Sequence, residues 1–367
     1  MRIVHLTSAH PRDDIRIFIK MCTSLAGNYN VSSVVADGFG NISNDVLSIF
    51  DVGAPNGGRL SRMTRTVRLI YKKAILLDAQ LYHLHDPELL PIALKLKRLG
   101  KVVIFDAHED LPKQLLAKPY LAPQVSYVLS NIFRIYEKWV CSKLDAVIGA
   151  TPVITAKFNK YCSLTENINN HPILNDINVV GTDCKKLQEI VYVGRISEIR
   201  GIKPLVKSLS KLKGVRLNLI GEFGNKEIKK EVKSLPEFKL VNELGFKSRN
   251  EVADILARSK IGIVTFLATP NHVDAQPNKM FEYMSAGLPV VTSNFPLWRE
   301  IVEGNKCGIC VDPEDIDEIA SAIQYLVDNP IEAERMGGNG RKAVMEKYNW
   351  EQEEKKLLKL YKNLLPF

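Results

Sequence analysis

The chain has 367 residues, of which 46% are hydrophobic and 25% charged, with a formal net charge of +9. This is the composition of an ordinary soluble globular protein with a sizeable core, and the length predicts two or three domains. No uninterrupted apolar run approaches the roughly 18 residues that span a bilayer, and the start, MRIVHLTS, is typical of a strand rather than a signal peptide. We therefore expect a cytoplasmic protein.

Short β-branched runs alternate with longer helical patterns along the whole chain. This alternation predicts an α/β fold with parallel sheets covered by helices on both faces, arranged as two Rossmann-like domains. The segment 171–187 has no sustained period and is rich in turn residues, so we place a linker there. The predicted strands cover residues 3–8, 31–37, 79–86, 101–107 and 145–150 in the first half, and 189–194, 215–221, 261–266 and 288–293 in the second.

The loop after the first predicted strand, TSAHPRDDIRIF, contains no glycine. Its composition argues against a G-x-G-x-x-G dinucleotide site and hence against a nicotinamide-dependent oxidoreductase. Its charged residues, Asp13, Asp14 and Arg16, have two interpretations. They contact a ligand, or they cap the following helix and form a local ion pair.

Residues 59–77 have an apolar stripe at helical spacing and six cations mainly on the other side. Such a helix either rests its basic face against anionic lipid headgroups or packs its stripe on the sheet with its cations solvated. Residues 1–175 hold 21 Lys and Arg against 14 Asp and Glu, which indicates an anionic partner for this half. Nucleic acid is not favoured, because no aromatics interleave the cations. The stripe comprises Leu60, Met63, Val67, Ile70, Ala74 and Leu77.

Histidines follow two predicted strands of the first half, in YHLHDPELLP and IFDAHEDLP. Ligands of open parallel sheets bind beyond the carboxyl ends of the strands, so His108 is placed to offer its ring or its backbone carbonyl to a reacting group. The alternative is a structural histidine. His83 and His85 straddle the end of their strand and are interpreted as structural.

The cysteines are scattered apart from Cys307 and Cys310, which form a C-x-x-C pair. Neither a following helix nor a second pair accompanies them, as a redox or zinc site would require. We therefore interpret both as small apolar residues of a strand.

The segment VYVGRISEIRGIKPLVKSL predicts a strand that passes through Gly194 and Arg195 into a helix beginning near Gly201. Arg195 and Arg200 stand at this strand-to-helix junction, where guanidinium groups and free backbone N–H groups suit a phosphate. The spacing of a Walker loop is absent. Surface charge without a ligand is the alternative.

The segment QPNKMFEYMSAGLP predicts a helix with Pro277 as its first residue. Asn278, Lys279 and Glu282 share one side of its opening turns. A helix N-terminus has unpaired N–H donors and a partial positive charge, so a phosphate is expected there. Glu282, one turn further, is placed to accept hydrogen bonds from a vicinal diol such as that of ribose.

These motifs together resemble a known family. Residues 194–206, 274–302, 307–323 and 348–365 are similar to the C-terminal half of family 4 glycosyltransferases, which have the GT-B fold, and HLHDPELLP and DAHEDLP extend the likeness to the first half. The resemblance implies a retaining transfer of a sugar from a nucleotide diphosphate sugar, bound in the cleft between two domains, with no cofactor and no essential metal. It also implies that residues 350–367 pack back on the first domain, 1–175, beside a second domain of 176–349.

The resemblance assigns roles to individual residues. Glu282 resembles the second acid of the family's E-x7-E motif, which holds the ribose, and Asp274 stands at the first. Arg195 and Arg200 resemble the Arg and Lys pair on the diphosphate, where leaving-group charge develops. His108 resembles the histidine that faces the reacting sugar.

The chain departs from the family pattern in three places. Asp274 stands where glutamate is usual and AQPNK replaces a glycine-rich turn, which leaves the donor sugar open. Arg200 stands where lysine is usual, a change that preserves phosphate contacts. The loop near residue 10 lacks the glycines that admit close backbone approach, which leaves the acceptor open.

From these features we expect UDP sugars, with GDP sugars close behind, as donors of a hexosyl or N-acetylhexosaminyl group. The basic first half and apolar segments such as AKPYLAPQVSYVLSNIF favour a lipid-linked glycan acceptor at the inner face of a membrane. That placement suits assembly of O-antigen, capsule or exopolysaccharide. The alternatives are a GT-B nucleotide-sugar epimerase and a non-catalytic nucleotide-sugar-binding protein.

Overall fold

The computed structural model describes residues 1–43, 47–116, 118, 121–174 and 186–365. The chain divides into two compact units, which are described separately: unit 1 is Met1–Asn170 with Trp350–Phe367, and unit 2 is His171–Asn349. These limits lie near the boundaries expected after residue 175 and before residue 350. Most of the expected linker, residues 175–185, lies outside the described residues.

Unit 1 is built on one sheet whose described strands run in the order β3-β4-β2-β1-β5-β6-β7-β8. Neighbours are parallel except β3 and β4, which pair antiparallel. All five strands predicted for the first half are confirmed, and three strands that were not predicted stand at the two edges. The strands are β1 (Arg2–Leu6), β2 (Asn30–Val35), β3 (Ile42–Ser43), β4 (Leu47–Asp51), β5 (Leu81–Leu84), β6 (Val102–Ala107), β7 (Ala146–Gly149) and β8 (Thr165–Asn167).

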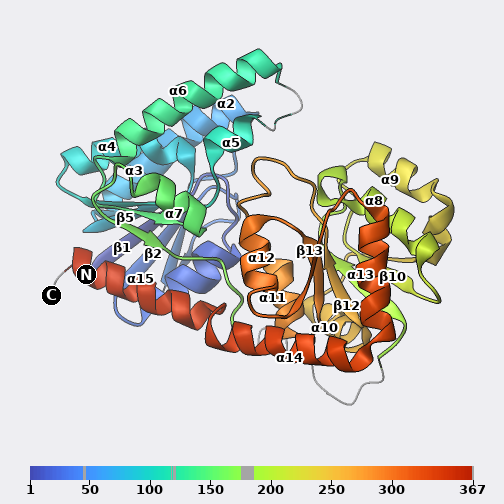
Figure 1. Cartoon of the computed structure of the whole chain (residues 1–367). Coiled ribbons are helices and arrows are strands. Elements are labelled where there is room, and N and C mark those ends of the chain that lie inside the picture. The colour runs from blue at the N-terminus through green and yellow to red at the C-terminus, as the bar shows by residue number, and fades with distance from the viewer. Residues whose placement is uncertain (44–46, 117, 119–120, 175–185, 366–367) are drawn as a thin grey trace. The chain divides into compact units, whose positions relative to one another are not determined.

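Helices cover this sheet, and α15 (Trp350–Leu364) at the end of the chain packs on unit 1 beside β8, α1 and η1 (Figure 1). Tyr361 of α15 is fully buried, and its hydroxyl lies 2.7 Å from Nδ1 of His83. The other helical elements of unit 1 are η1 (Ile15–Cys22), α1 (Thr23–Ala26), α2 (Arg59–Ser61), η2 (Arg62–Thr66), α3 (Val67–Leu77), η3 (Pro87–Leu89), α4 (Leu90–Arg98), α5 (Leu111–Leu116), α6 (Pro123–Cys141) and α7 (Pro152–Phe158).

The basic segment 59–77 is helical throughout, as α2, η2 and α3 in direct succession. The second half of the predicted apolar stripe, from Val67 to Leu77, is buried against β1 and β2. Leu60 and Met63, at its start, are exposed instead, because the helix begins beyond the part that packs on the sheet. This segment is therefore mainly a domain helix with a solvated basic face.

Unit 2 is built on a parallel sheet of order β11-β10-β9-β12-β13-β14. Its four predicted strands are confirmed. The described strands are β9 (Glu189–Val193), β10 (Arg216–Ile220), β11 (Val241–Gly245), β12 (Ile261–Val264), β13 (Val290–Ser293) and β14 (Gly308–Val311), and the helical elements are η4 (Glu198–Arg200), α8 (Ile202–Ser208), η5 (Leu209–Lys211), α9 (Lys226–Lys233), η6 (Pro236–Leu240), α10 (Arg249–Arg258), α11 (Asn278–Ser285), α12 (Pro296–Val302), α13 (Ile316–Asp328) and α14 (Pro330–Glu346).

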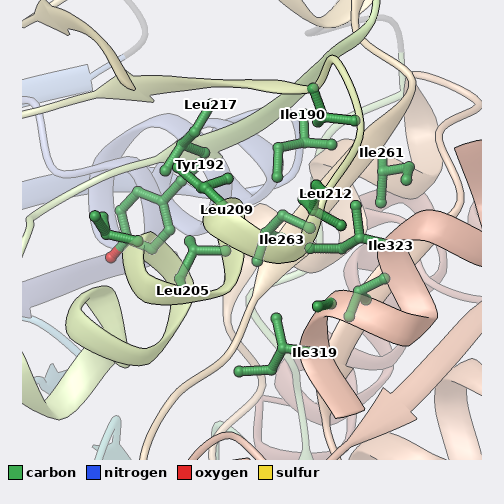
Figure 2. Packing of buried hydrophobic residues seen from close by; sticks show 14 of the residues in the cluster. Ile190, Tyr192, Leu205, Leu209, Leu212, Leu217, Ile261, Ile263, Ile319 and Ile323 are labelled. Atoms are coloured by element: carbon green, nitrogen blue, oxygen red, sulfur yellow. The ribbon is translucent and has the colours of Figure 1, made fainter. Parts of the chain in front are cut away.

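The core of unit 2 fixes the strand ends that matter for the site. Figure 2 shows Ile190 and Tyr192 of β9 packed with Leu205 of α8 and Ile319 of α13. Burial of this apolar cluster stabilises the unit by about 25 cal/mol for each Å² removed from water. Tyr192 also bonds its hydroxyl to the carbonyl of Arg195 at 2.8 Å, which ties the loop after β9 to the core.

Candidate functional site

Three residues converge where β9 ends in unit 2. Gly194 has φ +120°, which L-residues with side chains rarely adopt. A Cβ at this position would stand 3.2 Å from Nζ of Lys279 and 3.5 Å from a terminal guanidinium nitrogen of Arg200. The glycine therefore admits two cations to the backbone at the end of the strand. The predicted grouping of Gly194, Arg200 and Lys279 is present in the fold.

Lys279 has an unusual environment for a lysine. Its Nζ is buried and has no hydrogen-bond partner among the described residues. The ammonium lies 3.9 Å from the ring centroid of Tyr192 and 5.3 Å from that of Phe266. Burial, followed by the charge of Arg200, holds the pKa of Lys279 well below its usual range, and Glu282 acts in the opposite direction. An anion at this point would supply the missing partner.

The two arginines after β9 differ in position: the guanidinium of Arg200 lies beside Lys279 at Gly194, whereas that of Arg195 lies beside Gly224. Arg200 is half-buried, donates to the carbonyl oxygen of Arg195 at 3.2 Å and lies 5.4 Å from the ring of Phe266. Arg195 is exposed and donates to the carbonyl oxygen of Gly224 at 3.2 Å. Both bonds run to backbone carbonyls, so the guanidinium groups keep donors for a phosphate.

Helix α11 presents its N-terminus at the same strand end. The hydroxyl of Tyr283 accepts a 2.7 Å hydrogen bond from the backbone N–H of Val193, the last residue of β9. Gly262 of β12 leaves room for this ring, because a Cβ there would overlap it. Pro277 precedes the helix rather than opening it, with ψ 125°, and as the N-cap residue it makes no side-chain capping bond. The first N–H groups of α11, at Asn278 and Lys279, therefore receive no hydrogen bond from the N-cap side chain.

The two acids of the predicted E-x7-E-like pair are both half-buried. Glu282 lies one turn into α11, and its negative charge acts to raise the pKa of Lys279. Asp274 lies in the irregular segment between β12 and α11, whose backbone is held by a 2.6 Å bond from the indole of Trp298 to the carbonyl of Ala275. The predicted roles of both acids stay predictions.

A second polar cluster lies at the strand ends of unit 1. His108 follows β6, and its Nε2 lies 2.8 Å from Oδ2 of Asp106 and 3.3 Å from Nδ1 of His85. Asp106 is fully buried and also accepts two hydrogen bonds from Arg16, at 2.9 and 2.7 Å. Asp106 thereby orients His108 with its Nδ1 edge directed away from the carboxylate.

For the charged loop after β1, the predicted helix cap is confirmed and the predicted local ion pair is wrong. Asp14 caps η1 by accepting hydrogen bonds from the N–H groups of Arg16 and Ile17, as the capping alternative predicts. The predicted local ion pair is wrong, because Arg16 reaches across the sheet to Asp106. Spacing along the chain cannot reveal a partner on a distant strand.

Three buried histidines lie together: His5 of β1, His83 of β5, and His85 directly after β5. Nδ1 of His5 lies 2.9 Å from Nε2 of His85, and His83 and His85 stack with centroids 4.4 Å apart. The structural interpretation of His83 and His85 agrees with their burial. Two groups, His5 with His83 and His85, and His85 with Asp106 and His108, have the spacing of metal ligands. Five ring nitrogens of these histidines already have protein partners, and the expectation of no essential metal stays a prediction.

The buried histidines predict loss of stability in mild acid. Burial, followed by the charge of His85, lowers the pKa of both His5 and His83 well below 6.5. Between that lowered value and 6.5 the unfolded chain binds more protons than the folded one, so stability rises with pH and falls on acidification. From pH 6.5 to 5.5 these two residues should lower the free energy of unfolding by about 2 kcal/mol, measured by urea denaturation.

Two variants test the sign of this effect. His83→Gln should flatten the pH dependence. His10→Gln should steepen it: burial disfavours charged His10, yet the hydrogen bond of Asp14 and the charges of Asp86 and Asp14 raise its pKa, so His10 offsets part of the loss. An unchanged slope in both variants would contradict the assignment.

The cysteine interpretation is confirmed for the described pair. Cys310 lies in β14 and Cys307 directly before it, and both are buried free thiols. Burial raises the pKa of Cys307 to about 12 and that of Cys310 to about 11, so both stay protonated and unreactive. Cys184 lies outside the described residues.

Comparison with known proteins agrees with this geometry. Residues 181–343, which include Arg195, Arg200 and Lys279, match the family described as Glycosyl transferases group 1. The second half of the chain is therefore similar to the glycosyltransferases of this group. The chain is 23% identical over 293 residues to a glycogen synthase of Mycobacterium tuberculosis, covering 70% of this chain and 69% of the relative. It is 28% identical over 193 residues to the capsular polysaccharide biosynthesis glycosyltransferase CapM of Staphylococcus aureus, covering 50% and 47%.

The whole fold is also shared with a solved structure that holds UDP and glucose. Alr3699/HepE of Anabaena, in complex with UDP and glucose, superposes with a TM-score of 0.71 at 16% identity and covers 98% of this chain and 99% of that one. The GT-B fold expected from the glycosyltransferase motifs is therefore confirmed, including the two parallel sheets. No helix in the described part of the chain is both long and apolar enough to cross a bilayer.

Sequence reasoning missed the partners that shape both clusters. Tyr192 and Phe266 line the ammonium of Lys279, but each reads as an ordinary strand aromatic in the sequence. Asp106 lies inside the predicted strand 101–107, where a charged residue on a buried strand is itself a signal. His272, half-buried beside Phe266, carries no sequence pattern that marks it.

Proposed function

We propose that the protein is a retaining glycosyltransferase of family 4 that transfers a hexosyl or N-acetylhexosaminyl group from a nucleotide diphosphate sugar. The observation that carries this proposal is the buried, unpartnered ammonium of Lys279 beside Arg200 at a glycine strand end. Two like charges are held together only where an anion compensates them during function. A diphosphate carries enough charge to do so.

The donor would be held from three sides of this strand end. Lys279, Arg200, Arg195 and the N-terminus of α11 at Asn278 would bind the diphosphate, and the open backbone at Gly194 would let it approach. Glu282 would accept hydrogen bonds from the ribose, and Asp274 would contact hydroxyls of the donor sugar. UDP is the favoured nucleotide, since the similar HepE structure holds UDP and glucose. No metal is required by this arrangement, because the cations neutralise the leaving group.

The reaction would proceed on one face of the donor sugar. The bond between the anomeric carbon and the diphosphate oxygen breaks, and a bond to the acceptor hydroxyl oxygen forms on the same face. The acceptor proton passes to a diphosphate oxygen, so no protein nucleophile is needed. Cations that stabilise the departing charge contribute most. His108, oriented by Asp106, would face the reacting sugar, as the family resemblance implies.

The acceptor proposed is a glycan or lipid-linked glycan in assembly of a surface polysaccharide such as O-antigen, lipopolysaccharide, capsule or exopolysaccharide. The similarity to the capsular glycosyltransferase CapM supports this class. The excess of cations in residues 1–175 supports a peripheral position on the inner face of a cell membrane. No nucleic acid partner is proposed.

The donor assignment is tested by Arg195→Ala and Glu282→Ala. Each should lower transfer from UDP sugars about ten- to a hundredfold, because Arg195 is exposed and Glu282 would contact only the ribose. Release of UDP is measured with a panel of nucleotide sugars, and Arg299→Ala, an exposed arginine of α12, serves as control. Undiminished transfer in both variants, or an epimeric nucleotide sugar formed without acceptor, would contradict the proposal.

A further inference from the structure

The longest helix of unit 1, α6, carries apolar side chains on both its inner and its outer face. The inner face packs on the core of unit 1 through Phe133, Tyr136, Val140 and Cys141, and it also buries Ser126, Ser130 and Glu137. Its exposed face carries large apolar side chains, with Ile135 exposed to 67%, Ile132 to 59% and Trp139 to 48%. A helix that only covers a sheet places its apolar stripe inward and its polar residues outward. The outer face of α6 is therefore shaped for contact with something other than water.

The exposed apolar residues form one continuous stripe. They recur at intervals of three and four along the helix and cover four turns. Single exposed apolar residues are common on protein surfaces, but a contiguous row of this length marks an interaction site. The stripe consists of Val125, Val128, Leu129, Ile132, Ile135 and Trp139.

Cations border the stripe and acids are absent from it. Arg134 and Lys138 lie on its edge, both exposed, and Lys143 lies with its ammonium 3.8 Å from the ring of Trp139. The acid of α6, Glu137, is buried and bonded to Lys157. The outer face of this helix is thus apolar and positively charged, with no negative charge of its own.

We propose that α6 lies in the headgroup layer of an anionic membrane, with its apolar stripe inserted and Arg134 and Lys138 on lipid phosphates. This rests on the proposed function, because it explains how a lipid-linked acceptor is reached. A second copy of the chain fits less well, since a symmetric contact between two α6 stripes would bring like charges together. The basic segment 59–77, whose stripe from Val67 onward is buried, is not the inserting helix.

Trp139 supplies a direct readout. The other tryptophans, Trp298 and Trp350, are buried, so a change in fluorescence on adding vesicles reports on α6. With phosphatidylglycerol-containing vesicles the emission should shift to the blue and be quenched by lipids brominated in their acyl chains. Vesicles of phosphatidylcholine alone should give little shift. Absence of the shift, or an equal shift with both lipids, would overturn the proposal.

Substitutions separate insertion from loss of fold. The quadruple variant Val128→Ser, Ile132→Ser, Ile135→Ser and Trp139→Ser should weaken vesicle binding about a hundredfold in flotation. Arg134→Gln with Lys138→Gln should weaken it about five- to tenfold for each cation removed. Phe246→Ser with Ile331→Ser, exposed apolar residues of unit 2, is the matched control and should leave binding unchanged.

Two further measurements keep this inference distinct from the proposed function. Release of UDP from a donor sugar, measured without vesicles, should be unchanged in the quadruple variant. Vesicle binding that survives the quadruple substitution would overturn the inference and leave the transferase function standing. The wild-type chain could instead sediment as a dimer and the quadruple variant as a monomer, with no lipid-dependent shift in Trp139 fluorescence. That result would assign the stripe to contact with a second copy of the chain.

Discussion

Replacing Lys279 by methionine should make the donor-free protein more stable and abolish most of its activity. Methionine keeps the length and apolar stem of lysine but removes an ammonium that is buried without a hydrogen-bond partner. Relief of that unpaired charge should raise the free energy of unfolding by about 1–3 kcal/mol at neutral pH. Loss of the same charge should lower sugar transfer about a thousandfold, because it stabilises the leaving diphosphate in a site shielded from water.

The lowered pKa of Lys279 sets the pH dependence of both the stability effect and the activity effect. The pKa of Lys279 is held well below its usual value in the folded chain, chiefly by burial. Between the lowered value and 10.5 the unfolded chain binds the extra proton, so wild-type stability rises with pH and the gain from methionine shrinks. A bound diphosphate favours the charged form, so UDP affinity should fall as pH rises through the lowered pKa.

The measurements are thermal unfolding with and without UDP, calorimetric binding, and release of UDP from donor. Lys342→Met, in an exposed part of α14, is the matched control and should change none of them appreciably. A methionine variant that is less stable than the wild type, or that still binds UDP normally, would contradict the assignment of Lys279.

Replacing Asp106 by asparagine should destabilise unit 1 by about 3–5 kcal/mol. The substitution leaves the guanidinium of Arg16, which is 4% exposed, without its counter-charge. It also replaces one of the two acceptor oxygens with an NH2 group, so Arg16 and His108 can no longer keep all of their present acceptors. Burial favours the neutral acid, but Arg16 and His108 outweigh it and hold the pKa of Asp106 well below 3.8. This contribution is present above pH 3.8 and is lost as pH falls through the lowered value.

Urea denaturation of single and double variants separates the cost of an unpaired Arg16 from the contribution of the ion pair itself. Asp106→Leu combined with Arg16→Met removes both charges and should recover part of the lost stability, since a buried pair is replaced by apolar groups. Equal stability of Asp106→Asn and the wild type would show that the buried network contributes nothing. Activity of the double variant, measured well below its unfolding midpoint, reports the role of His108 orientation separately.

Much of the architecture could be predicted because it rests on local patterns. The nine predicted strands are all present, since continuous apolar runs such as residues 146–149 are what buried parallel strands require. The missed strands have weaker patterns: β11 is VNELG with a half-exposed face, and β3 has two exposed residues. Edge strands are less buried, and so their sequences carry less of the signal.

The sequence predicts which cations gather at the candidate site. It does not predict which side chains surround them. Strand-end placement brings Gly194, Arg200 and Lys279 together, because parallel strands end at one edge. Whether a cation is paired depends on distant side chains, which is why the isolation of Lys279 and the bond between Arg16 and Asp106 came only from the fold. The outward apolar face of α6 was similarly ambiguous, because periodicity does not tell which side of a helix is covered.

The last helix imposes an order on folding during synthesis. Unit 2 is one uninterrupted stretch, whereas unit 1 needs α15, in which Glu353 accepts a buried hydrogen bond from the backbone of Asn169 at 2.9 Å. On a ribosome the N-terminal sheet must wait for residues 350–364 to emerge, while the later stretch closes earlier. Unit 1 is thus synthesised first but completed last. A chain that ends before residue 350 lacks α15 and leaves the surface of β8 and α1 that this helix contacts exposed.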